Sequence, residues 1–326
     1  MIRIILAFIL SLLFSLAIMP FVIRLADKFK AKQPILRYVE SHAVKSGTPT
    51  MGGLMFILGI GIAVLTAGWE DLQNGLHNHL VVFLFALVFG AIGFVDDLQK
   101  LRHHANEGLT APQKFLLQLA AAIAFTVLLR RDGYLTPDLY IPFLNIEIVG
   151  IPWIVYMVFA AFVMVGTVNA VNLTDGVDGL ATGVTIPVML FYVAVSAWYG
   201  RSDLITAAAA MAGGLSAFLI YNFHPAKVFM GDTGSLFLGG AVCGLAFALD
   251  IPLVLILVGI IYILETLSDI LQVGYFKLTH GKRIFRMAPL HHHLELGGWS
   301  EVKLFCVFSG VTLLACVLAF LGVMGR

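Results

Sequence analysis

The chain has 326 residues, of which 60% are hydrophobic and 12% are charged, and its formal net charge is +1. Ordinary soluble domains carry about 25% charged residues, so this composition excludes a soluble globular protein. We predict an all-α polytopic membrane protein that forms a single integral membrane domain over residues 1–326.

Ten apolar segments along the chain are candidates for membrane-spanning helices. The third, fourth and eighth are short for a span of about 20 residues, so we expect them to extend into neighbouring residues such as Asp96 and Asp97. The ninth contains Glu265 and Asp269, which lie four residues apart on one helix face. Their side chains must face protein or water and not lipid. The ten segments are residues 4–23, 51–69, 80–95, 115–129, 151–171, 180–199, 204–223, 235–249, 251–276 and 304–325.

Basic residues divide unevenly between the connecting loops. Together with their flanking residues, the loops after odd-numbered segments hold fifteen of the 20 lysines and arginines. The remaining loops and the termini hold five. Cytoplasmic loops are enriched in Lys and Arg, so we predict that the odd-numbered loops are cytoplasmic and that both termini are periplasmic. The longest periplasmic loop, residues 132–150, contains the alternating stretch Asn145-Ile146-Glu147-Ile148, which favours a small β-hairpin.

The polar clusters of the chain gather in the predicted cytoplasmic loops. The first of these loops ends at residues 45–53 with one lysine, two threonines and three glycines. Such a composition would bring backbone N–H groups close to a phosphate. Capping of the following helix by Thr48 or Thr50 is the alternative.

Two adjacent carboxylates, Asp96 and Asp97, end the third apolar segment and precede Lys100 and Lys114. Adjacent carboxylates repel each other unless a cation compensates. Mg²⁺ prefers oxygen ligands and commonly shares one or two carboxylates with substrate phosphates. The pattern therefore favours a site for magnesium and a diphosphate at the membrane boundary, and solvated charges beside anionic lipid are the alternative.

The third and fourth cytoplasmic loops hold further acids between glycines. Asp175 and Asp178 of the third loop lie three residues apart with no glutamate at the twelfth position, so a calcium loop is a poor match. Glycines there would let the backbone approach a flat ligand such as a nucleobase, and a simple turn is the alternative. Asp232 of the fourth loop stands at the start of the eighth segment, where it could hold a cation or act as an N-cap.

Three adjacent histidines, His291, His292 and His293, lie in the fifth cytoplasmic loop. Successive helical residues point about 100° apart, so we do not expect these side chains to bind one ion. We predict that they donate hydrogen bonds to phosphate or sugar oxygens. A titrating surface patch is the alternative.

Six stretches in these loops resemble the signatures of the bacterial phospho-N-acetylmuramoyl-pentapeptide transferase family, within the polyprenyl-phosphate N-acetylhexosamine-1-phosphate transferase superfamily. They cover all five cytoplasmic loops in the expected order, and the layout of ten spans agrees. Any one stretch is a weak signal, but six together are very specific. They read KSGTPTMGG, GFVDDLQK, NAVNLTDGVDGLA, NFHPAKVFMGDTGSL, LQVGYFK and APLHHHLELGGW.

The resemblance implies a Mg²⁺-dependent phosphoglycosyl transferase of the bacterial inner membrane, multi-pass, with its active site on the cytoplasmic side. In such an enzyme undecaprenyl phosphate attacks the β-phosphorus of UDP-MurNAc-pentapeptide. UMP leaves and lipid I stays in the membrane, as the first membrane step of peptidoglycan synthesis. The implied partners are these two substrates and membrane lipid; no nucleic acid is expected, and a homodimer is left open.

The resemblance also implies roles for individual residues. Asp96 and Asp97 would be the catalytic acid pair, and Asp232 would be the catalytic acid that holds magnesium. The substrate-binding residues would be Lys45, Thr50, Lys100, Lys114, Asn172, Asp175, Gly176, Val177, Asp178, Asn222, Phe229, Gln272, Ala288, His291 and His292.

Two other functions stay open from the sequence. A related transferase would move GlcNAc-1-phosphate from UDP-GlcNAc to polyprenyl phosphate, and the PLHHH stretch argues against it as a muramoyl-type feature. A lipid carrier or secondary transporter would place acids near the middle of the bilayer, as Glu265 and Asp269 suggest, whereas most acids here lie at one face. Val177 and Asp269 depart from the family pattern, which has Leu and an apolar residue at these positions.

Overall fold

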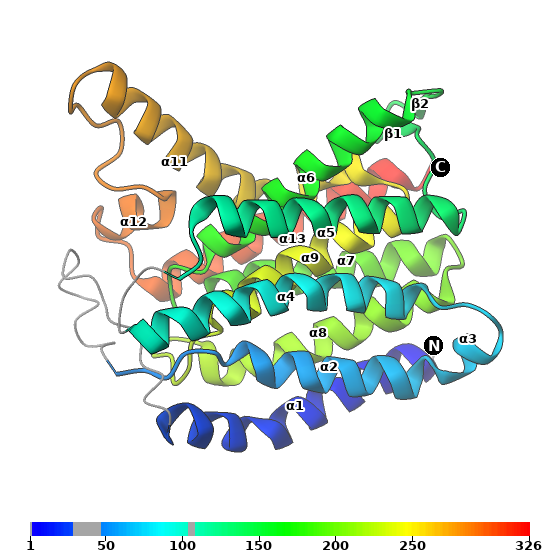
Figure 1. The fold of residues 1–326 in the computed structure, drawn as a ribbon, viewed down its shortest axis with the longest axis horizontal. Coiled ribbons are helices and arrows are strands. Elements are labelled where there is room, and N and C mark those ends of the chain that lie inside the picture. The colour runs from blue at the N-terminus through cyan, green and yellow to red at the C-terminus, as the bar shows by residue number, and fades with distance from the viewer. Residues whose placement is uncertain (1, 29–46, 104–107) are drawn as a thin grey trace.

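The computed structural model describes residues 2–28, 47–103 and 108–326, and it is a bundle of helices with one small hairpin among these residues (Figure 1). The helices run roughly along one common direction, so that their ends form two opposite faces. The elements are α1 (Ile2–Lys28), α2 (Gly53–Ala67), α3 (Trp69–Gln73), α4 (Asn78–His103), α5 (Ala111–Arg131), β1 (Leu139–Ile141), β2 (Ile146–Ile148), α6 (Trp153–Thr174), α7 (Leu180–Trp198), α8 (Ser202–Asn222), α9 (Gly231–Ala248), the 3₁₀-helix η2 (Pro252–Val254), α10 (Leu255–Val258), α11 (Ile260–Leu278), α12 (Leu290–Glu295) and α13 (Glu301–Val323).

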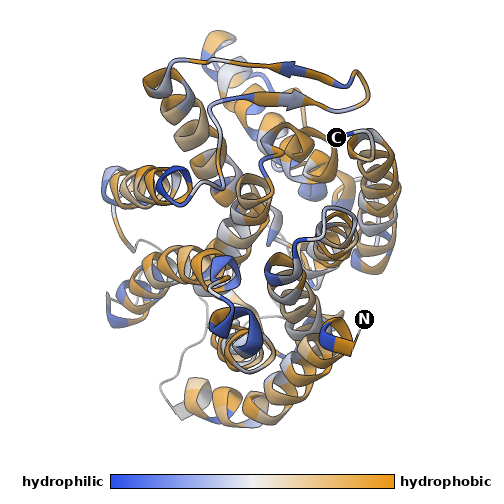
Figure 2. Cartoon of the chain, turned by 90° about the vertical axis from the view of Figure 1, so that its right-hand side faces the viewer, coloured by the Kyte–Doolittle hydropathy of each residue, from blue (hydrophilic) through white to orange (hydrophobic). Residues whose placement is uncertain are grey.

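Within the described residues, eight helices are long and apolar enough to cross a membrane, and a ninth span is added if a bent pair counts as one. Ten spans were predicted. The predicted segment that is missing from this count is the second, residues 51–69, where α2 is apolar but only 15 residues long. Figure 2 shows the corresponding pattern, with hydrophobic residues along the helices. The class of all-α polytopic membrane protein is confirmed.

The predicted ninth segment, residues 251–276, is bent within its length. Residues Pro252–Val258 and Ile260–Leu278 meet at an angle of 80°. Gly259 lies at the break, and glycine has the lowest helix propensity of any residue except proline. The bend directs α11 away from the rest of the bundle, as Figure 1 shows.

Two local predictions are confirmed. The third segment extends as α4 beyond its apolar run and includes Asp96 and Asp97, as expected for a run that is too short to span alone. The predicted hairpin also forms, because β1 pairs antiparallel with β2 and Tyr140 faces Glu147 across the ladder. The hairpin and both chain termini lie at the end of the bundle opposite to the C-terminal end of α4 (Figure 1).

Helix α9 lies at the centre of the bundle, because 89% of its residues are buried. It packs against α4 and α6. The contact with α4 is a backbone contact at Gly93, where an added Cβ atom would lie 2.1 Å from the carbonyl oxygen of Asp232. Only glycine lets the two helices approach this closely. The contact fixes Asp232, in the first turn of α9, beside the end of α4 that carries Asp96 and Asp97.

We predict that Gly93→Ala lowers both stability and activity, because the new methyl group must push α9 away from α4. Overpacking of this kind costs about 1–3 kcal/mol. The measurement is thermal unfolding of the detergent-purified protein, together with the rate of the transfer reaction that the sequence resemblance implies. Gly310→Ala in α13 is the matched control, since a Cβ atom there meets nothing within 4 Å. Equal melting temperatures of the two variants would contradict the packing argument.

Candidate functional site

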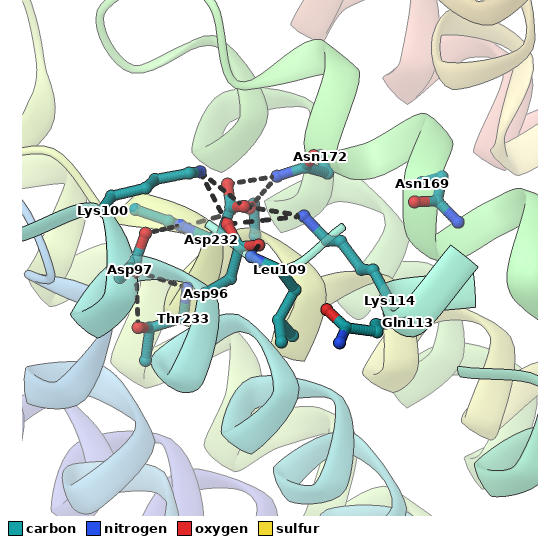
Figure 3. A network of polar contacts seen from close by, with 12 residues as sticks. Asp96, Asp97, Lys100, Leu109, Gln113, Lys114, Asn169, Asn172, Asp232 and Thr233 are labelled. Atoms are coloured by element: carbon teal, nitrogen blue, oxygen red, sulfur yellow. Dashed lines mark hydrogen bonds and ion pairs between the residues drawn. The ribbon is translucent and has the colours of Figure 1, made fainter. Parts of the chain in front are cut away.

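Asp232 is the centre of a polar cluster built from three other helices (Figure 3). Its Oδ2 atom accepts hydrogen bonds from Nζ of Lys100, at 3.0 Å, and from Nζ of Lys114, at 2.7 Å. Its Oδ1 atom accepts a hydrogen bond from the Asn172 side-chain amide, at 2.9 Å, and that amide also donates to Ser235. Lys100 belongs to α4, Lys114 to α5 and Asn172 to α6, so the cluster exists only in the folded bundle.

Asp96 lies beside Asp232 and shares its lysines. Its Oδ2 atom is 2.7 Å from Nζ of Lys100 and 3.9 Å from Nζ of Lys114. Its Oδ1 atom accepts the backbone N–H of Leu109 at 2.9 Å. The side chain of Asp96 is buried, so its charge depends on these protein partners rather than on water.

Asp97 caps the first turn of α9. Its carboxylate accepts the backbone N–H groups of Asp232, at 3.1 Å, and of Thr233, at 2.9 Å, and also the Thr233 hydroxyl, at 2.7 Å. A carboxylate at a helix N-terminus satisfies N–H groups that have no partner within the helix and interacts favourably with the helix dipole. The cap of α9 is thus supplied by α4 and not by Asp232 itself.

The carboxylates of Asp96, Asp97 and Asp232 can each place an oxygen within 4.8 Å of the other two. This all-oxygen set suits a hard cation such as Mg²⁺. Three carboxylates and the two ammonium groups of Lys100 and Lys114 leave one net negative charge (−3 + 2 = −1), so the cluster has the charge to hold a further cation. The residues present therefore fit a divalent metal ion. Of the three carboxylates, that of Asp97 is the least available to a metal ion, because it already caps α9.

Asp175 lies in the loop between α6 and α7, close enough to the cluster to be affected by it. Burial raises the pKa of its carboxyl group well above the usual range, and the nearby carboxylates of Asp232, Asp97 and Asp178 raise it further. The protonated form is therefore favoured, and in this form Asp175 can donate a hydrogen bond as well as accept one.

Asp178 and Asn222 were predicted to bind substrate, but the structure places their polar atoms in contacts within the protein. The Asp178 carboxylate accepts Nδ1 of His224 and the backbone N–H of Ala226, both at 3.0 Å. Asn222 accepts the hydroxyl of Thr182 and donates to the carbonyl of Val228, again at 3.0 Å. Both side chains are almost fully buried. Asp178 holds the turn before α9 against the loop that follows α6, and Asn222 joins that turn to α7.

The three adjacent histidines have three different partners, as their helical spacing predicts. Nδ1 of His291 lies 3.0 Å from Glu265, and Nδ1 of His292 lies 2.7 Å from Glu295. Nδ1 of His293 accepts the backbone N–H of Arg286 at 3.1 Å. The three side chains therefore do not converge on one ion.

The remaining predicted residues surround the same end of the bundle. Gln272 accepts the backbone N–H groups of Ile284 and Phe285 and so holds the loop before α12, which includes Ala288. The backbone N–H of Phe229 donates to the carbonyl of Pro49, which joins the loop before α2 to the loop before α9. Thr50 and Val177 are buried and Gly176 is half-buried, whereas Lys45 lies outside the described residues. Neither Thr48 nor Thr50 caps α2, whose N-cap is Gly52.

An apolar pocket of about 520 Å³ lies between α5 and α6, next to the polar cluster. Phe115, which immediately follows Lys114, forms part of its wall, and Asn169 is a polar residue of its lining, three residues before Asn172. The amide of Asn169 donates to Gln118 of α5 at 2.7 Å and so joins the two helices. The lining residues are Phe115, Leu119, Ile123, Met157, Val158, Ala161, Phe162, Val165, Gly166 and Asn169.

Comparison with known proteins gives the same assignment from the whole chain. A model of glycosyl transferase family 4 matches residues 79–250, and phospho-N-acetylmuramoyl-pentapeptide-transferase signature 1 matches residues 45–57. The phospho-N-acetylmuramoyl-pentapeptide-transferase of Clostridium acetobutylicum is 47% identical over 315 residues, which are 96% of each chain. The chain belongs to the phospho-N-acetylmuramoyl-pentapeptide-transferase family. The transferases of that name from Clostridium perfringens strain 13 and Clostridium botulinum strain Alaska E43 are each 45% identical and covered over at least 95% of their length.

Sequence reasoning missed four residues that shape the site of this transferase. Thr233 and Ser235 were not among the predicted site residues, although Thr233 binds Asp97 and Ser235 binds Asn172. The backbone of Leu109 was not considered. Glu265 was noticed as an acid in an apolar segment, but its partner His291 lies 26 residues away and no local spacing pointed to it.

We predict that Asp97→Ala lowers the thermal stability of the protein as well as its activity. Loss of the carboxylate leaves two buried backbone N–H groups of α9 without a partner, which costs about 1–3 kcal/mol. Thr233→Val is the graded comparison, because it removes only one of the three hydrogen bonds and should lower the melting temperature less. A melting temperature of Asp97→Ala equal to that of the wild type would show that the cap contributes nothing.

Proposed function

We propose that the protein transfers phospho-MurNAc-pentapeptide from UDP-MurNAc-pentapeptide to undecaprenyl phosphate, with formation of lipid I and release of UMP. The observation that carries the proposal is the half-buried cluster of Asp96, Asp232, Lys100 and Lys114 beside an apolar pocket. Such an arrangement suits a reaction that joins a water-soluble diphosphate to a lipid. Membership of the family, whose relatives carry the name of this transferase, supports it.

The chemistry depends on positioning and on charge neutralisation. Phosphoryl transfer requires little covalent participation by the protein, and both substrates are anionic. Lys100 and Lys114 lie where they can neutralise phosphate oxygens, provided that they are released from Asp232 and Asp96. Asp96, deprived of these partners, would be free to accept a proton from the lipid phosphate. The attack forms the bond from a lipid phosphate oxygen to the β-phosphorus and breaks the bond to UMP.

A magnesium ion is part of the proposal. Asp232, with Asp96 beside it, would hold the ion through carboxylate oxygens, and the bound ion would neutralise the diphosphate of the nucleotide sugar. Asp97 would support the site from behind by fixing the backbone of Asp232. Asn172 would keep the Asp232 carboxylate in its orientation through Oδ1.

The acceptor lipid would enter through the pocket between α5 and α6. Its walls are almost entirely apolar, and its end near Lys114 adjoins the polar cluster, so a prenyl chain in the pocket would bring its phosphate to the lysines. The distribution of basic residues supports a multi-pass protein of the bacterial cytoplasmic membrane with the site on the cytoplasmic side. The proposal requires one chain and no second copy.

We predict that Asp232→Asn lowers UMP release by about 100-fold or more, since it removes the charge on which the lysines and the metal ion depend. The assay contains purified protein, Mg²⁺, UDP-MurNAc-pentapeptide and undecaprenyl phosphate, and UDP-GlcNAc replaces the nucleotide substrate in a parallel reaction. Glu147→Gln in the periplasmic hairpin is the control and should keep wild-type activity. A rate of Asp232→Asn within twofold of wild type would refute the role of Asp232, and preference for UDP-GlcNAc would refute the substrate.

We predict that Ala161→Trp raises the KM for undecaprenyl phosphate by about tenfold, because the ring fills the apolar pocket at a cost of about 1–3 kcal/mol. The KM for UDP-MurNAc-pentapeptide should stay within twofold. Ile154→Trp, on an exposed part of the same helix, is the matched control. An unchanged KM for the lipid in Ala161→Trp would place the prenyl chain elsewhere.

A further inference from the structure

Glu265 and His291 form a buried acid–base pair outside the cluster around Asp232. Glu265 lies in α11 and is 0% exposed, and His291 lies in α12 and is 1% exposed. One carboxylate oxygen of Glu265 is 3.0 Å from Nδ1 of His291 and accepts its backbone N–H at 3.3 Å. Among the described residues, Glu265 forms its ion pair with His291. A buried carboxylate without a cationic or protonated partner would be strongly unfavourable.

The pair fixes which nitrogen of His291 is free. A carboxylate only accepts hydrogen bonds, so Nδ1 carries the proton that faces Glu265 and Nε2 is left for another partner. Nε2 is buried and has no hydrogen-bond partner within the described residues. Buried polar atoms in native proteins nearly always have a partner, so an orphaned ring nitrogen indicates an absent ligand.

Nε2 of His291 faces the loop that follows α6. A Cβ atom added to Gly176 would come within 2.2 Å of Nε2, so a side chain at this position would displace the imidazole. The same loop follows Asn172, whose amide holds Asp232, and it includes Asp175, whose pKa responds to the cluster carboxylates. The free nitrogen is therefore directed at the segment that borders the metal and phosphate cluster.

We propose that Glu265 is a positioning residue for the transfer reaction, which holds His291 with Nε2 directed at a phosphate oxygen of the bound nucleotide sugar. The inference rests on the proposed function, because it assigns the ligand of Nε2 to that substrate. With a proton on each ring nitrogen, His291 donates Nδ1–H to Glu265 and presents Nε2–H to an anionic oxygen as a charge-assisted hydrogen bond.

The experiment separates the action of Glu265 through His291 from a merely structural role. Glu265→Leu removes the acceptor at similar volume, and Glu265→Gln keeps a neutral acceptor for Nδ1–H. Each is made alone and together with His291→Leu. Asp269→Asn is the matched control, one turn further along the same helix and without an ion pair to His291; it should keep wild-type kcat/KM. Melting temperatures establish that each variant is folded.

We expect Glu265→Leu to lower kcat/KM for UDP-MurNAc-pentapeptide by about 10–100-fold, as is typical for loss of a group that orients a functional histidine. Glu265→Gln should retain several-fold more activity than Glu265→Leu. In the His291→Leu background, neither change should lower kcat/KM by more than about twofold, because the residue through which Glu265 acts is already absent. Losses that multiply in the double variants, or a single Glu265→Leu variant within twofold of wild type, would overturn the inference.

The same variants distinguish failure of this inference from failure of the proposed function. If the wild type does not release UMP, the proposed function fails, and Glu265 is then tested by calorimetric binding of UDP alone. Weaker binding of UDP in Glu265→Leu, but not when this change is added to His291→Leu, would still support positioning of His291 toward a phosphate. Equal binding of UDP by wild type and Glu265→Leu would overturn it.

Discussion

The contact between the end of α4 and the start of α9 is the constraint on which the rest of the site depends. Gly93 lets the two backbones touch, and the Asp97 carboxylate binds the first N–H groups of α9. These two features fix Asp232 next to Asp96, although 135 residues separate Asp232 from Asp97 in sequence. A polar cluster at the end of membrane helices needs such support, because like charges would otherwise repel each other.

The two adjacent acids therefore have different partners. Asp97 is directed into the protein and supports the backbone of α9, whereas Asp96 is directed at the lysines that it shares with Asp232. Lys100 and Lys114 hold the carboxylates together in the absence of substrate. Arrival of a metal ion and phosphates would redistribute these charges, with the cation near the carboxylates and the lysines near the phosphates. A pocket that is apolar on one side and charged at its end offers a lipid phosphate a place in this exchange.

The sequence predicted those features that depend on local patterns. Apolar runs predicted the helices, and alternation at residues 145–148 predicted the hairpin. The polar clusters in the loops predicted which end of the bundle holds the candidate site. It did not predict the break at Gly259, because an apolar run reads the same whether it is straight or bent by 80°. Nor could it predict that Asp97 caps a distant helix, that Asp178 binds His224, or that Glu265 binds His291, since these partners meet only through the packing of helices.

Carboxylates from the end of α4 and the start of α9 are proposed to form one site for a divalent cation. Binding of Mn²⁺, as a paramagnetic substitute for Mg²⁺, to the purified protein tests it most directly and can be followed by electron paramagnetic resonance. The account predicts one bound Mn²⁺ per chain in the wild type and binding weakened by at least about tenfold when Asp232 is replaced by Asn, as expected for loss of a charged ligand. Equal affinity of the two proteins for Mn²⁺ would contradict it.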